Sequence, residues 1–326
     1  MSNFMQLIKN EQNKIYRLKS TWAMYIILFL LVIAGAIITK VAFDDIHLPS
    51  YSENWEQELT ESNERMQQEN QSWSEDDASG WEYMIEYNEE QIAINEYYLE
   101  NQIEPPSYDG WSYLFDNSML SSIISLFTII IGAGIIANEY KWGTIKLLLI
   151  RPVSRTKILL SKYVSVLIFA LSALVFMMIG SLLVGAIFFG LNGMNPTLVM
   201  NSADGLVETS YLIEFLKEFG FSSVNLIMMA TFAFMISTIF RSSSFSIGIA
   251  IFLMLSGNTI VQFVSQYDWA KYILFANTDL SRYFNGIGPL MDGMTLGFSI
   301  TVLIVYYLVF IGLAWISFTK RDVAGN

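Results

Sequence analysis

The sequence of 326 residues contains no cysteine and a single histidine, His47. Without cysteine the chain can form neither disulfides nor thiolate metal sites, and one histidine argues against a metal centre or histidine-dependent catalysis. The phosphate-binding loop G-x-x-x-x-G-K-[ST] and the zinc-binding pair H-E-x-x-H are also absent. A membrane hydrolase with a serine nucleophile and a lysine base is left as an alternative. We therefore expect no enzymatic activity, metal or cofactor in this chain.

Charged residues are scarce, at 15% of the chain, whereas hydrophobic residues make up 53% and the mean hydropathy is +0.43. This composition predicts an all-α membrane protein with several spans, because backbone exposed to lipid must satisfy its own hydrogen bonds. Six apolar segments reach the roughly 20 residues that a spanning helix needs. They are residues 21–43, 117–137, 158–189, 221–240, 245–264 and 298–318.

The basic residues predict which ends of the spans face the cytoplasm. Thirteen of the 18 lysines and arginines lie in or next to the two termini and the connections 138–157 and 241–244, with only three of the 30 acids. Basic connections stay on the cytoplasmic side. The pattern predicts a multi-pass protein of the cell membrane with both termini, residues 1–20 and 319–326, in the cytoplasm.

The segment 44–116 between the first two spans contains 20 acids and one base, Arg65. Ile85, Ile92 and Leu99 recur every seven residues, and the polar run 75–80 interrupts the helical pattern. We expect an outer helical hairpin. Its negative charge would attract a cationic peptide by long-range steering, or it serves only to keep an outer domain soluble.

Three other segments outside the spans have patterns of their own. Residues 1–20 combine apolar positions at three- and four-residue intervals with a basic face, which predicts a helix at the membrane interface; a plain cytoplasmic tail is the alternative. An outer loop is predicted at 190–220. A second one, 265–297, is rich in aromatic residues, glycine and asparagine. We expect it to dip back into the outer leaflet, although interfacial anchoring explains its aromatics equally well.

The predicted spans offer neutral polar groups rather than acids or bases, which argues against ion-driven transport. Asn225, Asn258, Thr259 and Gln262 are the candidates for lining a substrate pathway. Hydrogen bonding between helices is the commoner role of such side chains.

The connection 138–157 is basic but has an apolar centre, so we expect a short helix that docks against another protein. Its pattern resembles E-x-x-x-G-T-x-x-x-L-L-x-x-P-x-S-R, followed by a lysine at the start of the next span, of type-2 ATP-binding-cassette (ABC) exporter permeases of Gram-positive bacteria. The matching residues are Glu139, Gly143, Thr144, Leu147, Leu148, Pro152, Ser154, Arg155 and Lys162.

The resemblance implies that this connection is the coupling helix and contacts a dimer of separately encoded ATPase subunits, which bind the ATP and Mg. It also implies a second permease subunit, identical or homologous, and no role for nucleic acid. In that frame Gly143 ends a helix, Thr144 or Ser154 caps one, and Arg155 pairs with ATPase carboxylates or lipid phosphates. For Lys162, setting the topology is an equal alternative.

The substrate stays open among an antimicrobial peptide, a lipid, a drug and an ion. The alternative function is a membrane sensor or immunity-type scaffold that binds an extracellular peptide through the acidic segment 44–116 without transporting it.

Overall fold

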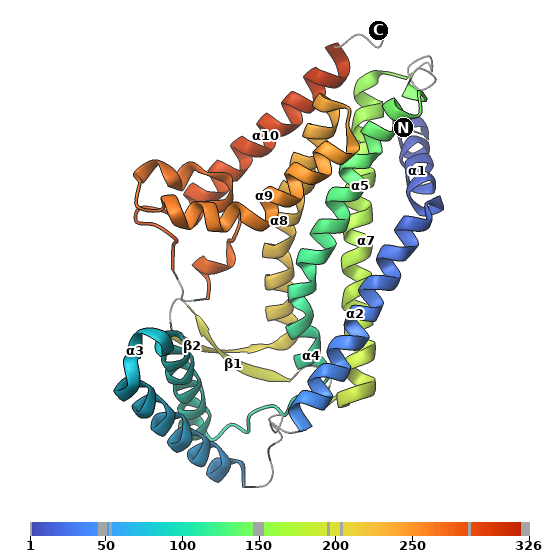
Figure 1. Ribbon diagram of the computed structural model, residues 1–326. Helices are drawn as coiled ribbons and strands as arrows, with labels where there is room; N and C mark the ends of the chain where they lie inside the picture. Colours follow the sequence, from blue (N-terminus) through green and yellow to red (C-terminus); the bar gives the residue numbers. More distant parts are fainter. Residues whose placement is uncertain are drawn as a thin grey trace.

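The computed structural model describes residues 2–44, 51, 54–145, 153–193, 196–202, 205–285 and 288–320. In this part the chain is almost entirely α-helical, and six helical segments are long and apolar enough to cross a membrane. The predicted all-α fold of a multi-pass membrane protein is confirmed. The N-terminal helix and the end of α10 lie at one end of the bundle, and the insert lies at the other (Figure 1).

All six spans begin earlier than the hydropathy predicts, by two or three residues in four of them and by seven and ten residues in the second and fourth. They are formed by α2 (Lys19–Asp44), the run of α4 (Gly110–Asp116), η1 (Asn117–Leu120) and α5 (Ser121–Lys141), α7 (Arg155–Phe189), α8 (Tyr211–Phe240), α9 (Ser243–Val264) and α10 (Leu296–Lys320). The second span starts at residue 110 instead of 117, because Asp109 accepts hydrogen bonds from the first amides of α4. The fourth starts at 211 instead of 221, and Ser210 caps it in the same way.

Helices α5 and α8 form the centre of the bundle and pack closely on each other. Small residues allow this approach: a Cβ added at Gly132 would lie 3.4 Å from the carbonyl oxygen of Ala230, and Ser237 Oγ donates to the carbonyl of Ala133 at 2.5 Å. Of the most apolar stretch of α8, 61% is buried, against 17% for α9 and 17% for α10. The outer helices therefore leave broad apolar faces for lipid or another subunit.

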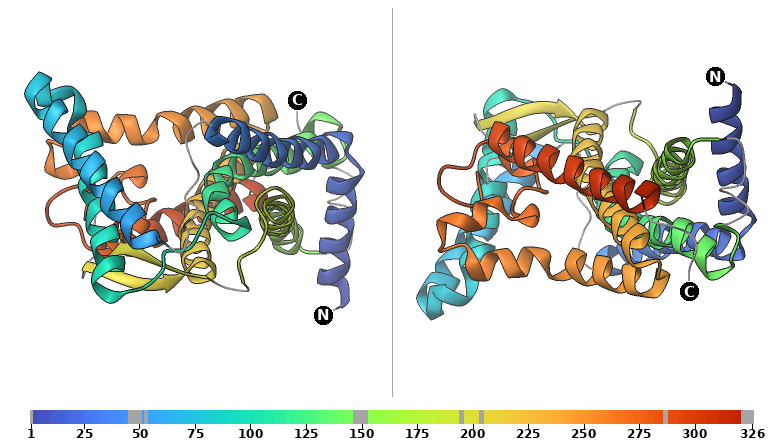
Figure 2. Two further views of the ribbon diagram at one scale, coloured as in Figure 1. Left: turned by 90° about the horizontal axis from the view of Figure 1, so that it is seen from below. Right: turned by 90° about the horizontal axis from the view of Figure 1, so that it is seen from above.

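The N-terminal helix α1 (Ser2–Arg17) is joined to α2 through a tight elbow at Leu18. Thr21 Oγ1 donates to the carbonyl of Ile15 at 2.5 Å, and Trp22 Nε1 donates to that of Tyr16 at 2.9 Å. Helix α1 runs crosswise to α7, which both panels of Figure 2 show end-on. A position of α1 at the membrane interface stays a prediction.

The insert folds back on itself as a helical hairpin. Its helix α3 runs from Trp55 to Asn101, and a straight helix would separate Asn63 and Asn95 by about 48 Å. Instead, Asn95 Nδ2 donates to Asn63 Oδ1 at 2.7 Å, so the two halves lie side by side. The side chains of residues 75–79, where the sequence predicts the break, lie outside the description.

A small antiparallel sheet, which the sequence pattern does not predict, packs on this hairpin. It pairs β1 (Thr197–Ser202) with β2 (Gly205–Ser210). The amide of Val199 donates to Tyr98 Oη at 2.8 Å, and Leu59 is buried beside them. Both strands are short and mixed in polarity, so their alternation alone is a weak signal.

The loop 265–297 turns back along the inner faces of α9 and α10. It contains η2 (Asp268–Tyr272), η3 (Leu274–Ala276) and η4 (Ser281–Tyr283). Phe275 packs against Gly257, and Tyr306 Oη donates to the carbonyl of Tyr272 at 3.1 Å. Gly257 lies about two turns inside the end of α9. The return of the chain agrees with a dip into the bilayer, whose depth stays a prediction.

We expect Gly257→Ala to destabilise the protein, because the added Cβ would lie 2.3 Å from Cγ of Phe275. Overpacking of this kind costs about 1–3 kcal/mol. Thermal unfolding in detergent, followed by tryptophan fluorescence, measures the effect. Gly248→Ala on the same helix is the control, since its Cβ would meet no atom within 4 Å. Equal unfolding temperatures for the two variants would contradict the packing of Phe275.

Candidate functional site

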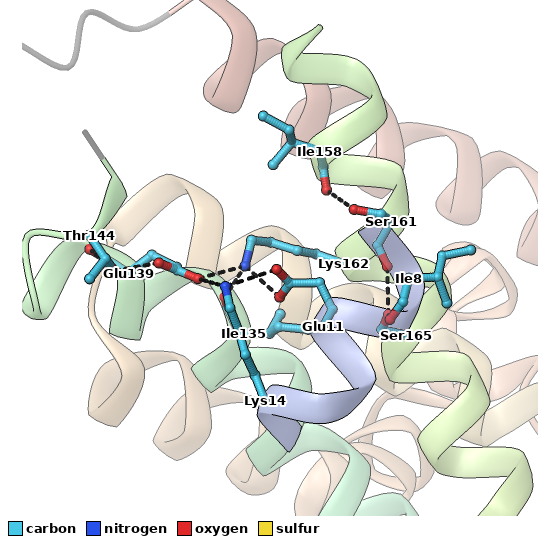
Figure 3. Close-up of polar contacts among 10 residues, drawn as sticks. All are labelled: Ile8, Glu11, Lys14, Ile135, Glu139, Thr144, Ile158, Ser161, Lys162 and Ser165. Atoms are coloured by element: carbon cyan, nitrogen blue, oxygen red, sulfur yellow. Dashed lines mark hydrogen bonds and ion pairs between the residues drawn. The ribbon is translucent and has the colours of Figure 1, made fainter. Parts of the chain in front are cut away.

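The candidate site lies where the connection 138–157 meets the spans, at the end of the bundle that carries α1. Glu139 is on the last turns of α5 and Lys162 is two turns into α7. Their side chains meet across the two helices, with 2.9 Å between Lys162 Nζ and Glu139 Oε1 (Figure 3). Lys162 Nζ also donates to the carbonyl of Ile135 at 3.2 Å. Two motif residues that stand 23 positions apart are thus in direct contact.

Helix α1 completes this pair into a cluster of four charges. Glu11 Oε2 lies 2.8 Å from Lys162 Nζ, and Lys14 Nζ lies 2.9 Å from Glu11 Oε1 and 2.7 Å from Glu139 Oε1. Glu11 and Lys14 stand three residues apart and so share one face of α1. Each carboxylate contacts both ammonium groups (Figure 3), which makes a closed ring of alternating charge. We call these four residues the charge cluster.

The charge cluster is buried on one side and open on the other. The side chain of Lys162 is 1% exposed and those of Glu11 and Glu139 are 8% exposed, whereas Lys14 is 53% exposed. Burial alone would lower the pKa of Lys14, but the neighbouring carboxylates of Glu11 and Glu139 raise it above its ordinary value. Lys14 therefore stays protonated at neutral pH, and the two acids and two bases of the cluster balance in formal charge.

Buried charges are costly unless they are paired, so the charge cluster fixes the geometry around it. Removal of one member leaves an opposite charge without its partner in a region that water scarcely reaches. The elements it joins, α1, α5 and α7, are held to one arrangement. From this position Glu139 fixes the end of α5 relative to α1 and α7.

Other motif residues shape the two ends of the connection. Gly143 follows α5 with a φ of +70°, which favours glycine, as predicted for a helix end. Thr144 Oγ1 donates to Glu139, and Ser154 caps α7 by accepting from the amide of Lys157 at 3.4 Å. Arg155 donates to the carbonyl of Thr319 at 3.0 Å and so ties the start of α7 to the end of α10. Leu147, Leu148 and Pro152 lie outside the described residues.

The candidate pathway residues are not brought together as one site. Asn258, Thr259 and Gln262 share an exposed face of α9, and Asn225 is half-buried on α8. No hydrogen bond links Asn225 to the other three in the described part of the chain. The same part holds no group of three histidines or acids that could bind a metal ion.

Two features of the charge cluster could have been predicted from the sequence. The prediction that the spans hold only neutral polar groups is wrong at Lys162, which lies inside the predicted span 158–189 and is buried. Glu11 is the one acid among residues 1–20, and Glu139 is the one acid in 138–157. A lone acid in a basic segment next to a membrane is a signal for a buried pair. The sequence does not show which lysines these acids meet.

We expect Lys162→Met to destabilise the protein by about 3–5 kcal/mol, because Glu11 and Glu139 then remain as buried charges with Lys14 alone between them. Chemical unfolding in detergent measures the loss. Lys157→Met, an exposed lysine on the same helix, is the control. Adding Glu11→Gln to Lys162→Met should restore part of the stability, and a control-like result for Lys162→Met would contradict the buried cluster.

The sequence of this chain is similar to those of known proteins. A family model described as a protein of unknown function (DUF2705) matches residues 78–324. The chain is 41% identical to the uncharacterized protein YhcI of Bacillus subtilis (strain 168), over 98% of this chain and 99% of that protein. It is 34% identical to the uncharacterized membrane protein YdbK of the same strain, over 65% of this chain and 82% of YdbK. The chain is a multi-pass membrane protein and belongs to the DUF2705 family.

Proposed function

We propose that this protein is the permease subunit of an ATP-driven ABC transporter of the bacterial cell membrane, an exporter that is coupled to a separate ATPase through the connection 138–157. The charge cluster is the observation that carries the proposal. It joins two residues of the permease-like pattern, Glu139 and Lys162, to the N-terminal helix. A connection whose cations only set the membrane topology would need no buried ion pairs at its ends.

The arrangement suits the transmission of force from the connection into the spans. A push on this segment acts on the end of α5 and the start of α7, which the charge cluster ties to α1. Separating these helices would expose or strand buried charges, so they move together rather than apart. Arg155 adds α10 to the group through the carbonyl of Thr319, and Trp315 Nε1 donates to Thr156 Oγ1 at 3.0 Å.

In this proposal all driving energy enters from the partner. ATP and Mg belong to two ATPase subunits, and closure of these subunits on ATP shifts the permease between two states. A ligand shifts such an equilibrium only by its different affinity for the two states. The rigid joint of α1, α5 and α7 gives the ATPase one body to displace.

A second permease subunit is supported by the exposed face of α9. Asn258, Thr259 and Gln262 are polar and exposed on a helix that is otherwise apolar. Polar groups facing lipid are unfavourable, whereas facing another subunit or a watery path satisfies them. We infer that two permeases, identical or homologous, meet along α9 and enclose the pathway between them.

The substrate class is inferred from the charge of the insert. The insert carries its acids on a paired helix at the end of the bundle opposite α1 (Figure 1), which is the outer side if the termini are cytoplasmic. An acidic outer domain suits a cationic antimicrobial peptide as cargo, ahead of a lipid or a drug.

Purification of the tagged chain from its native membranes in mild detergent should retain an ATPase with a phosphate-binding loop, identified by mass spectrometry. Leu148→Asp places a charge in the apolar centre of the connection and should lower the retained ATPase about tenfold. Ser265→Asp is the control, because Ser265 follows the end of α9 that is farther from the connection 138–157. Absence of any ATPase with the unaltered chain, or of any loss with Leu148→Asp, would contradict the proposal. A retained histidine kinase in its place would favour the sensor.

The inferred subunit contact can be tested with a photoreactive residue, p-benzoylphenylalanine, in place of Asn258. Irradiation of membranes should cross-link the chain to a second permease, which mass spectrometry identifies as a copy or a homologue. The same replacement of Leu308, which is 62% exposed on α10, is the control and should label lipid. Cross-linking from position 308 but not from 258 would place the contact on α10 and reject the α9 interface.

A further inference from the structure

A groove of about 570 Å³ opens beside the charge cluster, between the elbow of α1 and α2 on one side and helices α5 and α9 on the other. Its size falls within the range of ligand-binding pockets, roughly 300–1,000 Å³. Helix α2 packs mainly on α7, and α9 packs on α5 and α8, so the space between α2 and α9 is not closed by a helix of the described chain.

The deep part of this groove is apolar. Ile130, Ile131 and Ile135 of α5 form one wall, Ile247 of α9 forms a second, and Leu18 of the elbow lies opposite. The isoleucines belong to spans, whereas Leu18 lies just before the first span. A hydrocarbon chain is the ligand that such walls accept without leaving a polar group unpaired.

The mouth of the groove differs from its depth, because it carries a positive charge that no carboxylate neutralises. Glu11, Lys14 and Glu139 line the mouth, but both acids are already held by Lys14 and Lys162. Arg17, at the end of α1, is exposed and has no ion pair or hydrogen bond with the described residues. An anion is the partner that this guanidinium lacks.

A largely apolar groove with a cationic mouth at one end of the spans matches a ligand with an anionic head and a hydrocarbon tail. Trp142, which is 62% exposed at the same mouth, is an aromatic residue of the kind that settles at the level of lipid headgroups. The groove opens at the end that carries α1, and basic pockets between spans on the cytoplasmic side bind anionic lipid headgroups in general.

We propose that the groove binds one anionic phospholipid, with an acyl chain between α5 and α9 and its phosphate at Arg17. The lipid would wedge the elbow of α1 and α2 against α5, beside the charge cluster. It is a structural and regulatory ligand of this chain, separate from the transported cargo. The inference stands without the proposed transport function, because it depends on the groove and its charge alone.

Native mass spectrometry of the purified full-length chain, titrated with phosphatidylglycerol or phosphatidylcholine, tests the site. Arg17→Ala should weaken the binding of phosphatidylglycerol about fivefold, the effect expected of one basic residue at a headgroup. Lys9→Ala is the matched control, because Lys9 is an exposed base of the same helix that does not line the groove. Millimolar inorganic phosphate should not displace the lipid, since it lacks the acyl chain.

A second pair of variants tests the apolar depth. Ile247→Trp should fill the groove and lower the occupancy of phosphatidylglycerol at least as much as Arg17→Ala does. Leu255→Trp is the control, because Leu255 is 66% exposed on the same helix and outside the groove. Unchanged unfolding temperatures establish that the variants are folded.

Three results would overturn the proposal. Equal binding of phosphatidylcholine and phosphatidylglycerol would show that Arg17 does not select an anionic headgroup. Displacement by inorganic phosphate would reduce the site to an anion site without a lipid. A change of oligomeric state with Ile247→Trp, at unaltered lipid binding, would assign the groove to a second copy of the chain.

Discussion

The pairing of two buried carboxylates with two lysines is the constraint on which the end of the bundle that carries α1 depends. Glu11, Lys14, Glu139 and Lys162 come from three helices, and the three buried members, Glu11, Glu139 and Lys162, each need an opposite charge beside them. The ring contributes more to specificity than to stability, because well-packed apolar residues could fill the same space at lower cost. Its value is that it permits one relative position of α1, α5 and α7. The elbow at Leu18, the cap at Ser154 and the link from Arg155 to α10 all lie around this fixed point.

The spans differ in how much of their surface is buried within the bundle. Helix α8 is enclosed, while α9 and α10 leave most of their surface uncovered. In a soluble protein such faces would cause aggregation, but in a bilayer they are solvated by lipid or by a neighbouring subunit. The contrast divides the bundle into a rigid centre, α5 with α8, and an edge that is free to form contacts. The polar face near the end of α9 and the groove near the start of α9 both belong to that edge.

The fold could be predicted further from the sequence than the site could. Hydropathy locates six spans because a bilayer imposes a length that soluble proteins do not need. The cores of the spans agree, whereas their starts differ where a side chain such as Asp109 or Ser210 caps a longer helix. The strands 197–202 and 205–210 escape prediction because their stability comes from packing on Tyr98, which lies 101 residues earlier. Pairings across such distances leave no local pattern. For the same reason the sequence marks Glu139 as special without showing Lys14 or Glu11 as its neighbours.

The position of Glu11 has a consequence for how the protein is made. Glu11 and Lys162 are separated by 151 residues, so the N-terminal helix leaves the ribosome long before its partner exists. Until α7 has entered the bilayer, α1 lacks its contact with Lys162, although Lys14 can already meet Glu139 on α5. Lys162 in turn crosses into the membrane boundary uncompensated unless Glu139, synthesised 23 residues earlier, is already beside it. The contacts of Lys162 are therefore the last of the cluster to form, because α7 is synthesised after both α1 and α5.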